Sequence, residues 1–150
     1  MLIFLDIDGV MVPAKSWKRP EVLDDGFPAF SGAATHALRQ LISDNVTVML
    51  TTSHKSNFTI QEWMSIFQKR GIEIPSLKTL PENKTMISRK DELLRWFNQN
   101  PIEEDFLIID DDSSLNDLPL NLKKYLIQPS PLIGLSKEHL SALNFMITAK

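Results

Sequence analysis

The sequence contains no cysteine, and this absence excludes disulfide bonds, thiol chemistry and metal sites built from thiolates. Any metal ion must therefore be held by oxygen or nitrogen ligands. Long apolar runs are also missing, since none approaches the roughly 18 residues that a membrane-spanning helix needs. The apolar run from residue 2 to residue 5 is too short for the core of a signal peptide. We therefore expect no membrane association and, by default, a cytoplasmic location.

The chain has no excess of basic residues. Its 16 Lys and Arg against 19 Asp and Glu give a net charge of −3. There is thus no global electrostatic signal for nucleic acid or for an anionic membrane, although a local basic patch is compatible with this balance. A content of 43% hydrophobic and 23% charged residues is ordinary for a folded globular protein. We expect a single domain spanning residues 1–150.

Apolar, β-rich segments alternate with segments of helical periodicity along the chain. The expected strands cover residues 2–5, 45–50, 105–110 and 124–128, with a short strand or extended piece at 72–75, and the expected helices cover 35–43, 57–70, 88–98 and 136–147. This alternation predicts an α/β fold, a doubly wound (Rossmann-like) parallel sheet with helices on both faces. Ligands of such sheets bind at the carboxyl ends of the strands, near a topological switch point.

Polar residues stand at three of these strand ends. Asp6 and Asp8 follow the first strand, and side-chain alternation lets both face one side while Ile7 points into the core. Gly9 then permits a tight turn with positive φ. Short hydroxyl side chains follow the strand at 45–50, namely Thr51, Thr52 and Ser53. Three consecutive aspartates, Asp110, Asp111 and Asp112, stand at the end of the strand at 105–110.

Side by side, these ends could gather up to five carboxylates. Two unit charges 4 Å apart repel by about 4 kcal/mol at an effective dielectric constant of 20. Such a cluster therefore needs a cation or protonation, and oxygen ligands without cysteine favour Mg²⁺. Each feature alone also fits an ordinary turn, a solvated loop or a helix cap. Their occurrence together, at successive strand ends, favours a functional site.

These motifs resemble those of the haloacid dehalogenase (HAD) superfamily of phosphatases and phosphotransferases. "FLDIDGV" is similar to its first motif, "VMLT" to its second and "FLIIDDD" to its fourth. The third motif is a basic residue near a helix start, for which Arg89, Lys90 and Lys84 compete. Together with "LTTSHK", "RKDELLRWF" and "GLSKEHLSAL", the motifs most resemble small HAD domains associated with RNA-repair proteins.

The resemblance implies a Mg²⁺-dependent phosphoric monoester hydrolase that acts through an aspartyl-phosphate. Asp6 would be the nucleophile, and Asp8 would protonate the leaving oxygen and then activate water. Thr51, with Thr52 as the next candidate, would hydrogen-bond a phosphoryl oxygen. Lys90 or Arg89 would neutralise charge. The Mg²⁺ ligands implied are Asp6, the backbone carbonyl of Asp8, Asp110 and Asp111.

Only 42 residues separate Asp8 from Thr51 and 58 separate Thr51 from Asp110, so neither gap holds a separate cap domain. An open site suits a large phosphorylated substrate such as a nucleic-acid end or a phosphoprotein, unless a partner closes it. Residues 11–30 form a flap-like segment in which Trp17 lies among cations. Trp17 could stack on a base or simply anchor the flap. His54 and Lys55 could also touch substrate.

Two other functional classes compete with the phosphatase hypothesis. A phospho-receiver signalling domain also uses Asp, Mg²⁺, Thr and Lys, but its phosphoacceptor ends a middle strand, where this chain has Thr51. A catalytically silent HAD-like binding module would not need both Asp6 and Asp8. The sequence makes no prediction of an oligomeric state.

Overall fold

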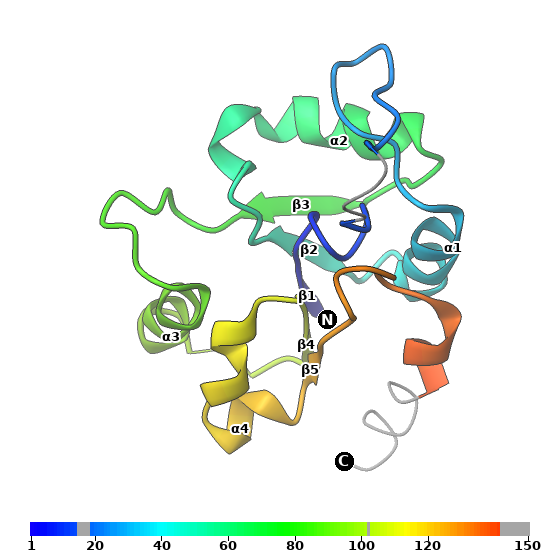
Figure 1. Cartoon of the computed structure of the whole chain (residues 1–150). Coiled ribbons are helices and arrows are strands. Elements are labelled where there is room, and N and C mark those ends of the chain that lie inside the picture. The colour runs from blue at the N-terminus through cyan, green and yellow to red at the C-terminus, as the bar shows by residue number, and fades with distance from the viewer. Residues whose placement is uncertain (15–18, 102, 142–150) are drawn as a thin grey trace.

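Five short apolar segments pair into one parallel sheet in the computed structural model, which describes residues 1–14, 19–101 and 103–141 (Figure 1). The strands are β1 (Leu2–Leu5), β2 (Thr47–Leu50), β3 (Ser76–Thr79), β4 (Phe106–Ile109) and β5 (Leu126–Ile127). Their order is β3-β2-β1-β4-β5. The chain winds from β1 toward one edge and then from β4 toward the other. The topological switch point therefore lies between β1 and β4.

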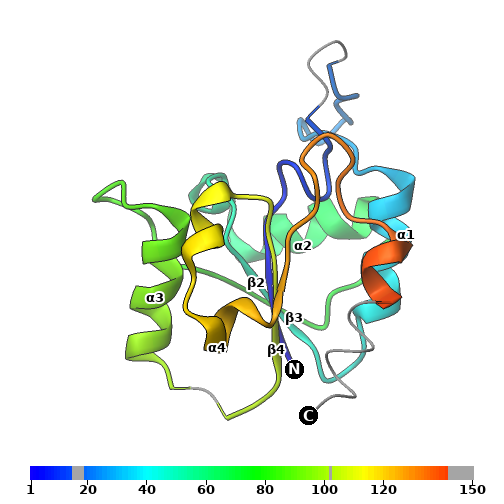
Figure 2. The same ribbon diagram turned by 60° about the horizontal axis from the view of Figure 1, so that its bottom comes forward.

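Helices cover both faces of this sheet, as Figure 2 shows. The helices α1 (Gly32–Leu41) and α2 (Ile60–Lys69) lie on one face, and α3 (Arg89–Gln99) and α4 (Leu120–Lys123) lie on the other. Side chains of β1 alternate between the two cores, since Ile3 and Leu5 join the cluster under α1 and α2 whereas Leu2 and Phe4 join the cluster under α3. The predicted doubly wound α/β fold is confirmed.

Capping residues fix where the helices begin, and this explains several shifted boundaries. Ser31 caps α1 by accepting from the Ala34 N–H, so the helix starts three residues before the predicted start. Thr59 forms a capping box with Glu62, and α2 consequently begins at Ile60. The residues just before it form a separate 3₁₀ turn, η1 (Lys55–Asn57).

The short strand predicted at 72–75 is wrong in position, because β3 pairs over residues Ser76–Thr79. Ile72 and Ile74 are buried and alternate as in a strand, but they lie outside the ladder, and Pro75 lacks the N–H that a ladder requires. The 3₁₀ helix η2 (Ser113–Asp117) and the short helix α4 were not predicted. The predicted closing helix is observed over residues 137–141, and its remainder lies outside the described residues.

The gaps between the strand ends hold no separate cap within the described ranges, as the fold prediction required. Among the helices in this part of the chain, none is long and apolar enough to cross a membrane. The described part of the flap-like segment contains a small hairpin, in which the Leu23 N–H donates to the Phe27 carbonyl and the Ala29 N–H donates to the Glu21 carbonyl. The other part, with Trp17, lies outside the described residues.

Arg70, at the end of α2, holds this hairpin against the body of the domain. Its guanidinium donates to both carboxylate oxygens of Asp25, at 2.7 and 3.1 Å, and to the carbonyls of Phe27 and Pro28. The Arg70 side chain is 3% exposed and the Asp25 side chain 15%. The hydrogen bonds from Arg70 hold the pKa of Asp25 at about 2. A buried, fully bonded cation therefore fixes the fold of residues 21–29.

Replacing Arg70 with alanine should lower the free energy of unfolding by about 2 kcal/mol, because the partly buried Asp25 carboxylate would lose its charged partner. Urea denaturation followed by circular dichroism measures this loss. The stabilisation by Arg70 in the wild type should disappear as pH falls from about 4 toward 2. In that range the unfolded chain gains a proton on Asp25 that the folded state does not yet bind, because the folded pKa is about 2. Arg39→Ala, exposed on α1, is the matched control. Equal effects of the two changes would contradict the clamp.

Candidate active site

Three strand ends meet at the switch point because β1 lies between β2 and β4 in matched register. Leu5 of β1 pairs with Leu50 on one side and with Ile109 on the other. The next residue of each strand is therefore Asp6, Thr51 or Asp110. All three continue the alternation that places Phe4, Met49 and Ile108 in the core under α3. Their side chains consequently gather on the α3 face.

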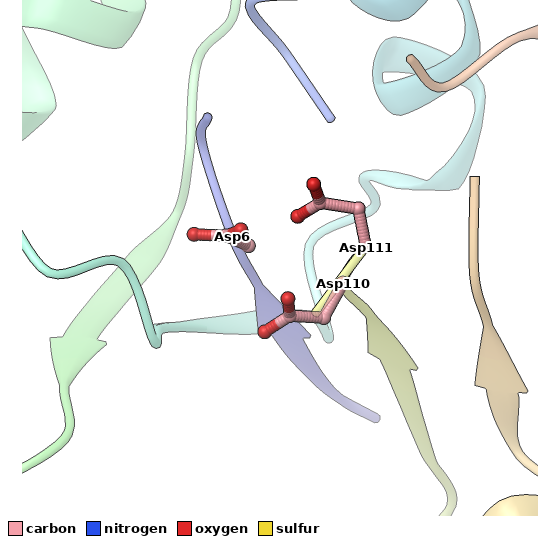
Figure 3. Close-up of side chains that lie close together, drawn as sticks. All are labelled: Asp6, Asp110 and Asp111. Atoms are coloured by element: carbon pink, nitrogen blue, oxygen red, sulfur yellow. The ribbon is translucent and has the colours of Figure 1, made fainter. Parts of the chain in front are cut away.

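Three carboxylates converge at this point, as Figure 3 shows. Asp6, Asp110 and Asp111 each place an oxygen within 4.8 Å of the other two. Asp6 and Asp110 are buried and Asp111 is partly exposed. The predicted gathering of acidic strand ends is thus observed with three carboxylates rather than five.

Gly9 allows this close approach. Its φ is +79°, and a Cβ at this position would lie 2.1 Å from Oδ2 of Asp111. The turn it begins is tightly folded, because the Ile7 carbonyl accepts from the N–H groups of Val10, Met11 and Val12. The glycine therefore serves both the backbone conformation and the position of the third carboxylate.

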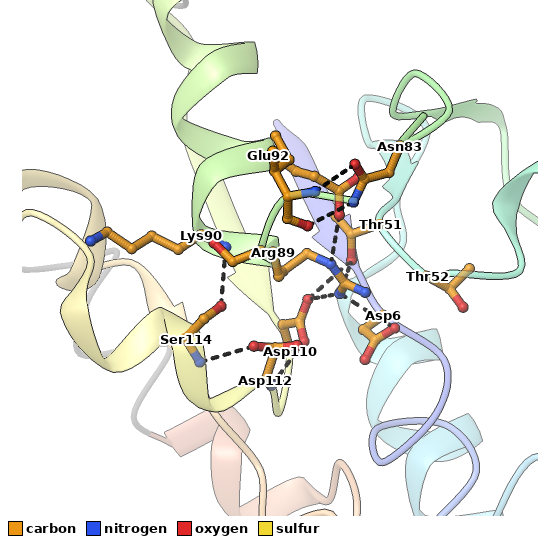
Figure 4. A network of polar contacts seen from close by, with 12 residues as sticks. Asp6, Thr51, Thr52, Asn83, Arg89, Lys90, Glu92, Asp110, Asp112 and Ser114 are labelled. Carbon is orange, nitrogen blue, oxygen red and sulfur yellow. Dashed lines mark hydrogen bonds and ion pairs between the residues drawn. The ribbon is translucent and has the colours of Figure 1, made fainter. Parts of the chain in front are cut away.

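Arg89 is the base that contacts the acidic cluster (Figure 4). It is the first residue of α3, and the Ser88 cap fixes the helix start beside the strand ends. Its Nη1 donates to the Asp110 carboxylate, donates to Thr51 Oγ1 at 3.2 Å and lies 3.6 Å from Asp6 Oδ1. Thr51 Oγ1 in turn donates to Asp110 Oδ2 at 3.2 Å. One guanidinium thus connects all three strand ends.

A second layer of charge lies behind Arg89. Glu92, one helical turn further along α3, places Oε1 3.5 Å from Arg89 Nε and Oε2 3.0 Å from Lys55 Nζ. Lys55 is only 4% exposed, and the Trp63 indole N–H donates to its carbonyl at 3.1 Å. Lys55, predicted to touch substrate, is therefore placed in a buried ion pair. Sequence reasoning missed Glu92, although its spacing of three residues from Arg89 is a recognisable helical pairing signal.

Burial and mutual repulsion set the protonation of the carboxylates. Burial, reinforced by the charge of Asp110 and only partly offset by Arg89, raises the pKa of Asp6 to about 9. Burial also raises the pKa of Asp110 against the opposing effect of Arg89. Burial acts to lower the pKa of Arg89, but Asp110 and Asp6 raise it above its ordinary value. The guanidinium therefore stays charged, while Asp6 holds a proton near neutral pH.

The donor set fits a hard divalent cation. Around the strand ends, four carboxylates (Asp6, Glu92, Asp110 and Asp111) face two cations (Arg89 and Lys55). When all four carboxylates are ionised, one divalent ion would balance the two uncompensated negative charges. Three converging carboxylate oxygens without nitrogen or sulfur ligands suit Mg²⁺, which keeps several waters in its coordination shell. The Asp6, Asp110 and Asp111 side chains would hold it.

The other predicted site residues lie around this centre. Asp8 is exposed, and its Oδ2 lies 2.8 Å from His54 Nε2. Its carboxylate is not part of the three-aspartate cluster, and the role of its carbonyl as a metal ligand stays a prediction. Thr52 is buried and its hydroxyl accepts from the His54 N–H at 3.3 Å. Thr52 is directed away from Asp6 in Figure 4.

Lys90 and Lys84 do not join Arg89. The Lys90 side chain extends away from the cluster in Figure 4, and its backbone N–H donates to Ser114 Oγ at 3.1 Å. Lys84 is exposed on the loop before α3. Asp112 caps η2 by accepting from the Ser114 N–H at 2.9 Å, which agrees with its predicted place in the following loop.

Comparison with protein families agrees with this geometry. The family model described as the HAD domain in Swiss Army Knife RNA repair proteins matches residues 2–140. The chain belongs to this family. The resemblance inferred from the sequence motifs is thereby confirmed. A search of curated proteins gave no significant match.

Gly9→Ala should weaken Mg²⁺ binding by this HAD domain, because the added methyl group displaces the Asp111 carboxylate. Gly26→Ala is a matched control, since Gly26 also has a φ of +79° but its Cβ would meet nothing within 4 Å. Both variants should lose about 1–2 kcal/mol of stability from the left-handed backbone. Calorimetric titration with Mg²⁺ should distinguish them. Equal affinities in the two variants would contradict the role of Gly9.

The raised pKa of Asp6 predicts that Mg²⁺ binding releases a proton. Between about pH 6 and pH 8 the apparent Kd should fall roughly tenfold per pH unit, because the ion needs the ionised carboxylate. Calorimetry in buffers of different ionisation enthalpy measures both the affinity and the proton release.

The raised pKa of Asp6 also makes the stability of the metal-free domain depend on pH. Whereas the Mg²⁺ affinity should rise with pH, this stability should fall. In EDTA, stability should fall as pH rises from about 4 toward 9, since the folded state retains a proton that the unfolded chain has lost. Asp6→Asn should remove this slope in thermal unfolding. A Mg²⁺ affinity independent of pH would contradict the raised pKa.

Proposed function

We propose that this HAD domain is a Mg²⁺-dependent phosphoric monoester hydrolase that acts through an aspartyl-phosphate intermediate. The observation that carries the proposal is the convergence of Asp6, Thr51, Arg89 and Asp110 at three adjacent strand ends. This arrangement joins a carboxylate nucleophile to a fixed cation and a hydroxyl donor. Such groups favour phosphoryl transfer, where positioning and charge stabilisation supply most of the catalysis. We take residues 1–150 as one domain for this activity.

In the first step, an oxygen of the Asp6 carboxylate attacks the substrate phosphorus. The bond between phosphorus and the ester oxygen breaks, and Asp8 donates a proton to the leaving oxygen. Thr51 and Arg89 contact the phosphoryl oxygens and stabilise their negative charge. The product is an alcohol, and the phosphoryl group remains on Asp6.

In the second step, Asp8 takes a proton from water, and the water oxygen attacks the phosphorus of the aspartyl-phosphate. The bond from phosphorus to the Asp6 oxygen breaks, which releases inorganic phosphate and regenerates both acids. His54, 2.8 Å from the Asp8 carboxylate, orients it for these transfers. Mg²⁺, held by Asp6, Asp110, Asp111 and the Asp8 carbonyl, would supply charge neutralisation at the phosphoryl group.

The proposed substrate is a phosphorylated nucleic-acid end, with RNA favoured over DNA. Two observations support this class: the family's description refers to RNA repair, and within the described residues no separate cap encloses the site. A phosphoprotein fits the open site equally well but has no support from the family. The net charge of −3 leaves recognition of the substrate to local contacts.

The proposal is tested by hydrolysis of p-nitrophenyl phosphate with Mg²⁺ and with EDTA. Asp6→Asn should abolish activity, and Asp8→Asn should lower kcat by about 10²–10⁴-fold. Asp44→Asn, exposed before β2 at the opposite end of the sheet, is the control and should retain wild-type kcat. RNA and DNA ends with 3′- or 5′-phosphates, phosphopeptides and sugar phosphates then identify the substrate class.

Activity that persists in Asp6→Asn would refute the assigned nucleophile. No Mg²⁺-dependent hydrolysis of any of these phosphoesters would refute the enzyme proposal and favour a silent binding module. Activity confined to sugar phosphates would refute the polynucleotide substrate alone.

A further inference from the structure

A groove of about 490 Å³ adjoins the candidate active site. It runs between the turn that follows β2 and the loop that precedes α3, and Arg89 and Asp112 are among its lining residues. Its volume lies within the range of about 300–1,000 Å³ that small-ligand pockets occupy. A substrate whose phosphoryl group contacts Arg89 would extend the rest of its structure into this space.

Besides the carboxylates of Glu82, Glu92 and Asp112, the groove offers neutral hydrogen-bonding groups. Ser53, Ser56 and Asn57 line it from the β2 side and are exposed. Within the part of the chain that the structure describes, their side chains make no hydrogen bonds. The two cations that line the groove, Lys55 and Arg89, are both paired with carboxylates. A polyanionic backbone requires unpaired Lys or Arg, whereas a sugar and a base match hydroxyl and amide groups.

Met86 stands at the opposite side of the groove. It is 89% exposed and has a φ of 52°, in the left-handed region that non-glycine residues seldom adopt. Asn83 closes the loop around it by accepting from the Ile87 N–H at 3.0 Å and donating to the Ile87 carbonyl at 2.7 Å. The loop therefore presents a polarizable thioether to solvent beside the groove, and such a group makes favourable contacts with aromatic rings.

We infer that this groove binds the terminal nucleoside of the phosphorylated substrate. Ser53, Ser56 and Asn57 hydrogen-bond the sugar hydroxyls and the base edge, and the Met86 side chain lies against the base. This inference rests on the proposed function, because the phosphoryl group at Arg89 fixes which part of the substrate reaches the groove. The residues in the groove thereby determine preference for a nucleotide over a simple phosphoester.

The test compares kcat/KM for nucleoside 3′- and 5′-monophosphates with kcat/KM for ethyl phosphate, a phosphoric monoester that carries neither sugar nor ring. Wild-type protein with Mg²⁺ should prefer a nucleotide. The double variant Ser56→Ala/Asn57→Ala and the single variant Met86→Ala should each lower the ratio of the two kcat/KM values by about five- to tenfold, mainly through KM for the nucleotide.

Two surface variants on α2 serve as matched controls. Ser65→Ala and Met64→Ala change exposed residues of the same types outside the groove, and they should leave the ratio at its wild-type value. Thermal unfolding by circular dichroism verifies that every variant is folded. Equal loss on both substrates, or an unchanged ratio in the groove variants, would overturn the inference while the proposed function stands.

If the wild-type protein hydrolyses neither of these substrates nor any phosphoester named under the proposed function, the proposed function is refuted and the groove remains to be tested by binding. The groove is then tested by calorimetric titration of the Mg²⁺-loaded protein with the same nucleotides. The groove variants should weaken binding by the same five- to tenfold factor, about 1–1.4 kcal/mol. Unchanged affinity, or no binding to the wild type, would overturn the inference.

Discussion

The crowding of buried carboxylates at the switch point is the constraint on which the rest of the site depends. Asp6 and Asp110 are side by side at the ends of β1 and β4, and burial alone opposes the ionisation of both. Arg89 offsets part of this cost, and Glu92 restrains Arg89 in turn. The protein thus stores an unfavourable charge distribution that a proton relieves near neutral pH and that a divalent cation would relieve more completely.

The fold produces this crowding through register and alternation rather than through any special loop. Matched pairing of Leu5 with Leu50 and Ile109 brings three strand ends to one level, and the period of two turns their next side chains toward α3. The helix α3 begins beside these strand ends, so Arg89 in its first turn lies close to all three of their side chains. The same apolar alternation that builds two hydrophobic cores therefore also aims the polar groups.

The sheet and the acidic strand ends were predictable because both depend on local alternation, and the family was predictable from the resemblance of the motifs. The choice between Arg89 and Lys90 was not predictable in this way. Adjacent residues point about 100° apart around a helix, so the choice depends on where Ser88 starts α3 relative to the sheet. Lys55 was expected to touch substrate because it follows the second motif, and only the tertiary position of Glu92 explains its burial. Likewise, Ile72 and Ile74 alternate as a strand does, but the ladder forms after Pro75, where N–H groups are available.

The cations at the strand ends and the groups proposed to recognise the substrate are different sets of residues. Lys55 and Arg89, the cations near the strand ends, are both paired with carboxylates, and the adjoining groove presents hydroxyl, amide and thioether groups beside the carboxylates of Glu82, Glu92 and Asp112. A polyanion that bound through unpaired lysines would release counterions and bind with a steep dependence on salt. A nucleoside held by neutral groups would not, since its contacts involve no phosphate beyond the reacting one. Under the proposed function, a protein whose active-site cations are paired with carboxylates acts on a nucleic-acid end by recognising the last nucleoside rather than the length of the strand.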